Sequence, residues 1–70
     1  MTLADYIMLS RKRNRMTQEE LGERVDSNRA SVSMWENQQR IPNLTQFSKL
    51  VGLFGWDAKV VMEVVHGLDV

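Results

Sequence analysis

The sequence predicts an all-α fold of four to five helices. Three observations predict it: apolar residues recur every three or four positions, helix-capping residues precede several of these runs, and the single proline lies in a stretch without periodicity. A chain of 70 residues is long enough for one domain, and without cysteine its stability must come from a small apolar core. We therefore expect one compact domain over residues 1–70.

Two helices are expected in the first part of the chain. Residues 3–14 have the apolar spacing of an amphipathic helix, and they end in basic residues that suit the negative end of the helix dipole. Thr17 and Glu20 have the spacing of a capping box, in which each side chain bonds the backbone of the other. A second, shorter helix is therefore expected over residues 18–25.

The letters "DSN" interrupt this second helix and contain residues that favour turns and caps. Asn28 can begin a third helix by accepting a hydrogen bond from the amide of Ala30 or Ser31. Two short helices joined by a turn of about three residues form a helix-turn-helix. The sequence therefore predicts this motif at residues 17–37.

The last third of the chain predicts one further helix clearly and another less clearly. Residues 44–54 repeat apolar side chains at helical spacing, and the helix is expected to end near Gly55. Residues 59–65, "KVVMEVV", are rich in valine, which favours strands, but they lie between a capping residue, Asp57, and Gly67. We favour a short helix here over a strand that pairs with a second subunit.

Composition excludes several classes of function. No apolar run approaches the roughly 18 residues of a membrane span, and the chain does not start like a secretory signal, so a cytoplasmic protein is expected. The single histidine, His66, has no cysteine or second histidine to form a metal site, and no glycine-rich phosphate loop occurs. We expect no enzyme activity, no cofactor, no metal and no small-molecule ligand.

The charge distribution gives only a weak indication of the partner. The net charge is zero, which by itself does not indicate a nucleic-acid partner. However, seven of the nine basic residues lie in the first forty positions, and four of them lie in "RKRNR" at residues 11–15. A basic run of this kind is as often a solvated helix end as a binding surface.

The segments "MTQEELGERV", "SVSMWEN" and "IPNLTQFSKLVGLFG" follow one another in this order. With them the sequence resembles the lambda-repressor-like helix-turn-helix family of phage repressors, Cro proteins and Xre-type regulators, over about residues 3–66. The resemblance implies an ion pair between Arg11 and Glu36, which would join the first and third helices. It also implies that Gln18 binds phosphate and braces the first residue of the recognition helix.

The resemblance further implies which residues hold the two short helices together, and these are Leu21, Val25, Val32 and Trp35. The sequence departs from the family at several positions around the turns. Gly22 replaces the usual alanine, which still allows close contact but is expected to weaken the helix by about 1 kcal/mol. Asp26 and Ser27 replace a glycine and an apolar residue of the turn, and Arg15 stands where a glycine or asparagine often ends the first helix. We therefore expect a slightly strained turn.

The stretch "NRASVSMWENQ" then fits a helix that enters the major groove of DNA. Arg29 can donate two hydrogen bonds to guanine, and the short Ala30 can approach a thymine methyl group. The residues expected to contact bases are Arg29, Ala30, Ser33 and Met34. The residues expected to contact phosphates are Gln18, Asn28, Asn37, Gln38, Gln39, Arg40 and Arg13. The alternative is that Arg29 and Met34 are simply exposed side chains.

We therefore expect a sequence-specific regulator of transcription that binds double-stranded DNA, most simply a phage or prophage Cro or repressor protein on a palindromic operator. Activation is equally open to this fold. A homodimer is expected. Its contact surface is placed in the C-terminal segment 56–70 and just before it, and consists of Phe54, Trp56, Val60, Val64 and Leu68. Alternatively, Trp56, Val61 and Val65 complete the core. Two other functions fit the sequence: the DNA-binding antitoxin of a toxin-antitoxin pair, and a protein-interaction domain without DNA binding.

Overall fold

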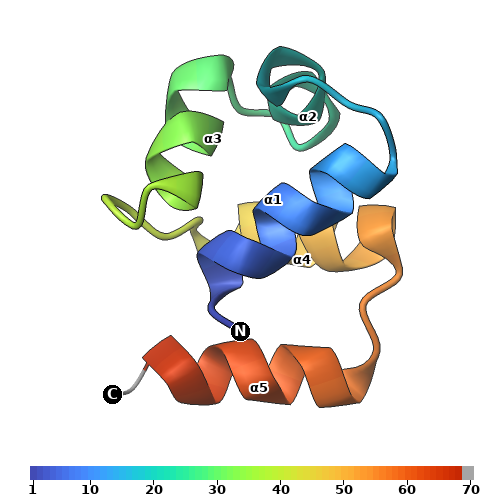
Figure 1. The fold of residues 1–70 in the computed structure, drawn as a ribbon, viewed down its shortest axis with the longest axis vertical. Coiled ribbons are helices and arrows are strands. Elements are labelled where there is room, and N and C mark those ends of the chain that lie inside the picture. Colours follow the sequence, from blue (N-terminus) through green and yellow to red (C-terminus); the bar gives the residue numbers. More distant parts are fainter. Residues whose placement is uncertain (69–70) are drawn as a thin grey trace.

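The computed structural model describes residues 1–68, and of Leu68 only the backbone. The described chain forms five helices. Figure 1 shows α2 and α3 next to each other at one end of the molecule, α1 and α4 crossing its middle, and α5 along the opposite end. The bounds are α1 Leu3–Arg13, α2 Gln18–Arg24, α3 Arg29–Glu36, α4 Leu44–Phe54 and α5 Ala58–Leu68. The prediction of an all-α fold is confirmed, as is the helix, rather than a strand, at residues 59–65.

Short-range hydrogen bonds set where the helices begin. Complete capping boxes start α1, α2 and α4, formed by the pairs Thr2 and Asp5, Thr17 and Glu20, and Asn43 and Gln46. The Asn28 side chain accepts a hydrogen bond of 2.8 Å from the Ser31 amide, and Asp57 accepts one of 3.0 Å from the Val60 amide. The caps predicted at Thr17, Asn28 and Asp57 are therefore confirmed.

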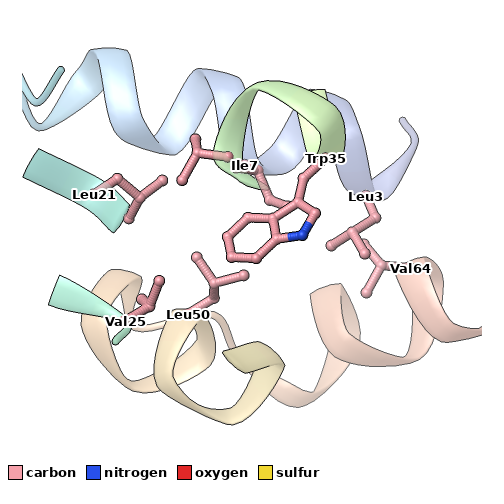
Figure 2. Packing of buried hydrophobic residues seen from close by; sticks show 8 residues of the cluster. Leu3, Ile7, Leu21, Val25, Trp35, Leu50 and Val64 are labelled. Carbon is pink, nitrogen blue, oxygen red and sulfur yellow. The ribbon is translucent and has the colours of Figure 1, made fainter. Parts of the chain in front are cut away.

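The core lies between the helix-turn-helix and the other three helices. Figure 2 shows the indole of Trp35 at its centre, with side chains from α1, α2, α4 and α5 around it. The buried residues of this cluster are Leu3, Ile7, Leu21, Val25, Val32, Trp35, Leu50 and Val64. Because Val32 and Trp35 turn one side of α3 inward, the opposite side of α3 faces solvent.

Two residues differ in burial from what the sequence predicts. Val64 is 1% exposed and packs in the core beside Leu3, so its assignment to a dimer surface is wrong. Val64 lies on the side of α5 that faces α1 and Trp35. Leu44 shares the helical spacing of the core residues but is 85% exposed, because it is the first residue of α4 and precedes the buried part of that helix.

The remaining dimer candidates are partly in the core as well. Phe54, Trp56 and Val60 are half-buried and pack against the core cluster, and the indole N–H of Trp56 donates to the Ser10 hydroxyl at 3.0 Å. In the alternative, Trp56, Val61 and Val65 complete the core. Trp56 and Val61 are half-buried but Val65 is exposed, so this alternative holds only in part. The side chain of Leu68 lies outside the described residues.

Two helices meet at Gly22, and only glycine fits there. A Cβ atom on this residue would lie 2.6 Å from the carbonyl carbon and 2.8 Å from the Cα of Asn28. Real Cβ atoms do not approach backbone so closely, so an alanine would push α2 and the start of α3 apart. The close contact expected at Gly22 is therefore confirmed, and the structure adds that it requires glycine, because the Cβ of the alanine usual in the family would overlap the Asn28 backbone.

The turn between α2 and α3 is strained, as expected. Asp26 has φ 54°, and Arg15, which follows α1, has φ 56°. This is a left-handed backbone conformation that residues other than glycine rarely adopt. The Asp26 carboxylate lies 2.9 Å from the Lys49 ammonium, and the Gln46 amide donates to the Ser27 hydroxyl at 3.4 Å. Both partners belong to α4, which therefore supports the turn.

A nearly buried polar network joins the first three helices at Glu36. The Arg11 guanidinium donates to both Glu36 oxygens, at 2.7 and 3.1 Å, and to the Met16 carbonyl at 2.9 Å. The Gln18 amide donates to the same carboxylate at 3.2 Å. The side chains of Arg11 and Glu36 are only 12% and 6% exposed. The position of the last turn of α3 therefore depends on α1 and α2.

At the other end of the molecule, Glu63 connects α5 to α1. Its carboxylate accepts a hydrogen bond of 2.7 Å from the Tyr6 hydroxyl and one of 3.2 Å from the N-terminal amino group. These two donors lower the pKa of Glu63, and the hydrogen bond to Glu63 raises the pKa of Tyr6. The network favours the ionised carboxylate, so it holds α5 on α1 best above the acidic range.

Gly22→Ala is expected to destabilise the protein by about 1–3 kcal/mol, although alanine is the better helix former, because the added Cβ overlaps the Asn28 backbone. Urea unfolding followed by circular dichroism measures the change. Gly52→Ala is the matched control: it is also inside a helix but has no atom within 4 Å of its Cβ position, so it is expected to stabilise by up to about 1 kcal/mol. Equal effects of the two substitutions would contradict the close contact.

Arg11→Met is expected to lower the free energy of unfolding by about 3–5 kcal/mol, because it leaves the nearly buried Glu36 carboxylate without its cation. The double variant Arg11→Met, Glu36→Met removes both charges and is expected to be more stable than the single variant. Both are compared by urea unfolding. If the single substitution costs less than about 1 kcal/mol, the ion pair does not hold α3 in place.

Candidate nucleic-acid interface

The outward side of α3 carries the residues predicted to contact bases. Arg29 and Ala30 are exposed in its first turn, and Ser33 and Met34 are half-buried one turn later. Residues three and four positions apart share a helix face, so these four side chains form one surface opposite Trp35. Arg29 is the only charged residue of the helix besides the buried Glu36. The structure therefore presents a mostly neutral surface with one cation at its N-terminal end.

Ser33 and Asn37 are hydrogen-bonded to each other at the C-terminal end of this surface. The Asn37 amide donates to the Ser33 carbonyl at 2.9 Å and to the Ser33 hydroxyl at 3.4 Å. A base or phosphate that binds here would meet side chains whose orientation is set beforehand. Pre-set groups lose less conformational entropy on binding.

Polar residues predicted to contact phosphates lie at both ends of α3. The backbone N–H groups of Gln39 and Arg40 donate to the Met34 carbonyl at 2.9 and 3.4 Å, so the exposed loop after α3 folds back onto the end of the helix. Gln38 in this loop has φ 60°, another left-handed residue. Asn28 caps the opposite end of α3. We call the surface formed by Arg29, Ala30, Ser33 and Met34 the recognition surface, because these residues are predicted to contact bases. It is flanked at both ends by exposed residues with amide and guanidinium side chains.

Gln18 contacts the C-terminal end of α3, which differs from the contact expected. Its amide donates to Glu36, and within residues 1–68 no hydrogen bond joins it to Arg29. It does line a shallow depression together with Arg29. Gln18 therefore braces the recognition helix through its last residue rather than through its first.

Arg13 is not brought to this surface. It lines a depression with Ser10 and Trp56, on the side of α1 that faces the end of α4 and the start of α5. Arg11, which points to Glu36, is two positions away, and residues two apart on a helix point in nearly opposite directions. Arg13 is thus separated from the other residues predicted to contact phosphates.

Two carboxylates beside Arg29 were not singled out from the sequence. Glu19 and Glu23 are exposed on α2 and line a depression with Asn28, Arg29 and Ala30. Their spacing of four residues predicts a shared helix face, but not that this face borders the recognition helix. The N-terminal end of the recognition surface therefore has one cation and two anions. Glu20, between them, points into its capping box, and the hydrogen bonds from Thr17 lower its pKa.

The described residues show neither a metal-binding cluster nor a membrane-spanning helix. Over residues 1–68, no three side chains of the types that bind metals gather at one place. None of the described helices has the length and apolar character needed to cross a membrane. His66 is an exposed residue in the last turn of α5.

Comparison with known protein families matches residues 7–57 to the family described as "Helix-turn-helix". The match covers more than half of the chain and includes α2, the turn and α3. Comparisons with curated proteins and with solved structures give no match. The capped two-helix unit, the buried side of α3 and the matched residues agree on one conclusion: the chain belongs to the lambda-repressor-like, Xre-type helix-turn-helix family of DNA-binding transcriptional regulators.

Proposed function

We propose that this chain recognises a palindromic operator in double-stranded DNA as a dimer, and that it acts as a repressor of the phage or prophage Cro type. The observation that carries the proposal is the outward side of α3, which has an exposed cation, Arg29, at its first residue and is held in place by the Glu36 network. An α-helix fits the major groove, and residues near its start reach the base edges.

Each base-contacting residue has a chemical role in this proposal. Arg29 donates two hydrogen bonds to the O6 and N7 atoms of guanine, the commonest specific contact. Ala30 lets the helix approach a thymine methyl group, and Met34 adds apolar contact beside it. Ser33 bonds a base edge or a phosphate. Gln18, Asn28 and the residues of the loop after α3 bind phosphates on either side and fix the helix in the groove.

A single domain of this size makes a limited contact with DNA, so two copies on half-sites one helical turn apart would increase the affinity. With Val64 in the core, we assign the dimer contact to the exposed apolar residues of α5, Met62 and Val65, which lie three positions apart on one face. The exposed parts of Phe54, Trp56 and Val60 lie towards the start of the same helix. A dimer on a site that overlaps a promoter would exclude polymerase.

Selection of duplexes from a random DNA pool tests the recognition surface. A palindromic site is expected, and Arg29→Ala should lose about 1–3 kcal/mol of binding free energy and relax the preference at one base position. Lys59→Ala is the control, because it removes the same charge from α5. Enrichment of no duplex, or an unchanged preference in Arg29→Ala, would sink the proposal.

Sedimentation equilibrium tests the dimer. Val65→Glu places a charge on the proposed contact and is expected to yield monomers that bind a single half-site normally but the full palindrome less tightly. Leu9→Glu is the matched control, since both residues are 43% exposed and Leu9 lies on α1. If Val65→Glu dimerises like the unmodified protein, the dimer contact lies elsewhere.

A further inference from the structure

Arg29 lines two adjoining depressions on the surface between α2 and α3, and a carboxylate lines each of them with it. One depression is lined by Arg11, Thr17, Gln18, Glu19 and Arg29, and the adjoining one by Glu19, Glu23, Ser27, Asn28, Arg29 and Ala30. Glu19 is the one residue that lines both depressions with Arg29. The side chains of Glu19 and Arg29 are exposed, and no ion pair joins these two residues in the part of the chain that the structure describes. Arg29 therefore shares both depressions with a carboxylate to which it is not paired.

An arginine at the start of a recognition helix has two kinds of ligand on DNA. A phosphate oxygen carries a negative charge, and its contact with arginine is the same for every sequence. The guanine edge offers two acceptor atoms but no net charge. A carboxylate next to the arginine repels the phosphate by the Coulomb interaction, whereas it acts only weakly on the neutral guanine edge. The same neighbour thus weakens the two kinds of contact unequally.

We propose that Glu19 is a specificity-determining residue, which disfavours phosphate as a ligand of Arg29 and so reserves this arginine for guanine. Glu23 adds to the negative charge on the side of Asn28 and Ala30. The zero net charge of the chain is consistent with this role, because there is little general attraction to DNA and the correct site must be held by base contacts. The inference rests on the proposed DNA-binding function and identifies how it discriminates between sequences.

The test compares Glu19→Gln with the unmodified protein on two duplexes, the selected site and a scrambled sequence of the same length and composition. Affinity for the scrambled duplex is expected to rise about fivefold, while affinity for the selected site rises less than about twofold. The slope of log K against log salt on the scrambled duplex should become steeper by about one, since Arg29 gains a phosphate contact. The ratio of specific to non-specific affinity therefore falls.

Glu20→Gln is the matched control. It makes the same change of net charge one residue away, and glutamine can replace glutamate in the capping box with Thr17. A smaller effect than that of Glu19→Gln is expected. In a second control, Glu19→Gln is combined with Arg29→Ala, which should abolish the gain on the scrambled duplex because the arginine that would bind phosphate is absent.

The outcomes separate this inference from the function on which it rests. If selection enriches no duplex, both are wrong. If selection yields a site that depends on Arg29, but Glu19→Gln raises affinity for both duplexes by the same factor, the function stands and the role of Glu19 is overturned. An effect of Glu20→Gln equal to that of Glu19→Gln also overturns it, because net charge rather than position would then be responsible.

Discussion

Glu36 lies at the end of α3, and its two oxygens receive donors from Arg11 of α1 and Gln18 of α2. The helices of the helix-turn-helix are only seven and eight residues long, which is too short to be stable in isolation. They depend on tertiary contacts, and this carboxylate is the polar contact shared by all three N-terminal helices. Because its charge is nearly buried, any arrangement that separates it from Arg11 is strongly disfavoured. The network therefore specifies the angle at which α3 leaves the body of the domain.

The apolar side of α3 determines how closely this helix packs against the core. Trp35 fills the centre of the core, and Val32 is fully buried one turn before it. At the other end of the motif, Gly22 lets the backbone of Asn28 approach α2 without a side chain between them. Close packing at three points leaves α3 little freedom to rotate or shift. A recognition surface needs this rigidity, because base edges are read by hydrogen bonds of defined direction.

The electrostatic character of this surface differs from that of a simple basic patch. Arg29 is one cation beside Glu19 and Glu23, and the basic run at residues 11–15 contributes one residue to a buried ion pair and another to the opposite side of α1. On the proposed function, the general attraction to phosphates is therefore weak, and hydrogen bonds to base edges supply much of the preference for one site. A protein of zero net charge can bind DNA in this way if its few cations are well placed.

The helices and the helix-turn-helix were predictable from local sequence, because apolar spacing is a local property and the caps predicted at Thr17, Asn28 and Asp57 lie three residues from their partners. The sequence also indicated the outward residues of α3, since inward and outward positions alternate with the helical period. The packing of helices distant in the chain, in contrast, buries Val64, leaves Leu44 exposed and makes alanine unfavourable at Gly22. The tertiary structure alone also placed Glu19 beside Arg29 and Arg13 away from it. These facts depend on how helices far apart in the chain pack against one another, and no local pattern encodes the distances between them.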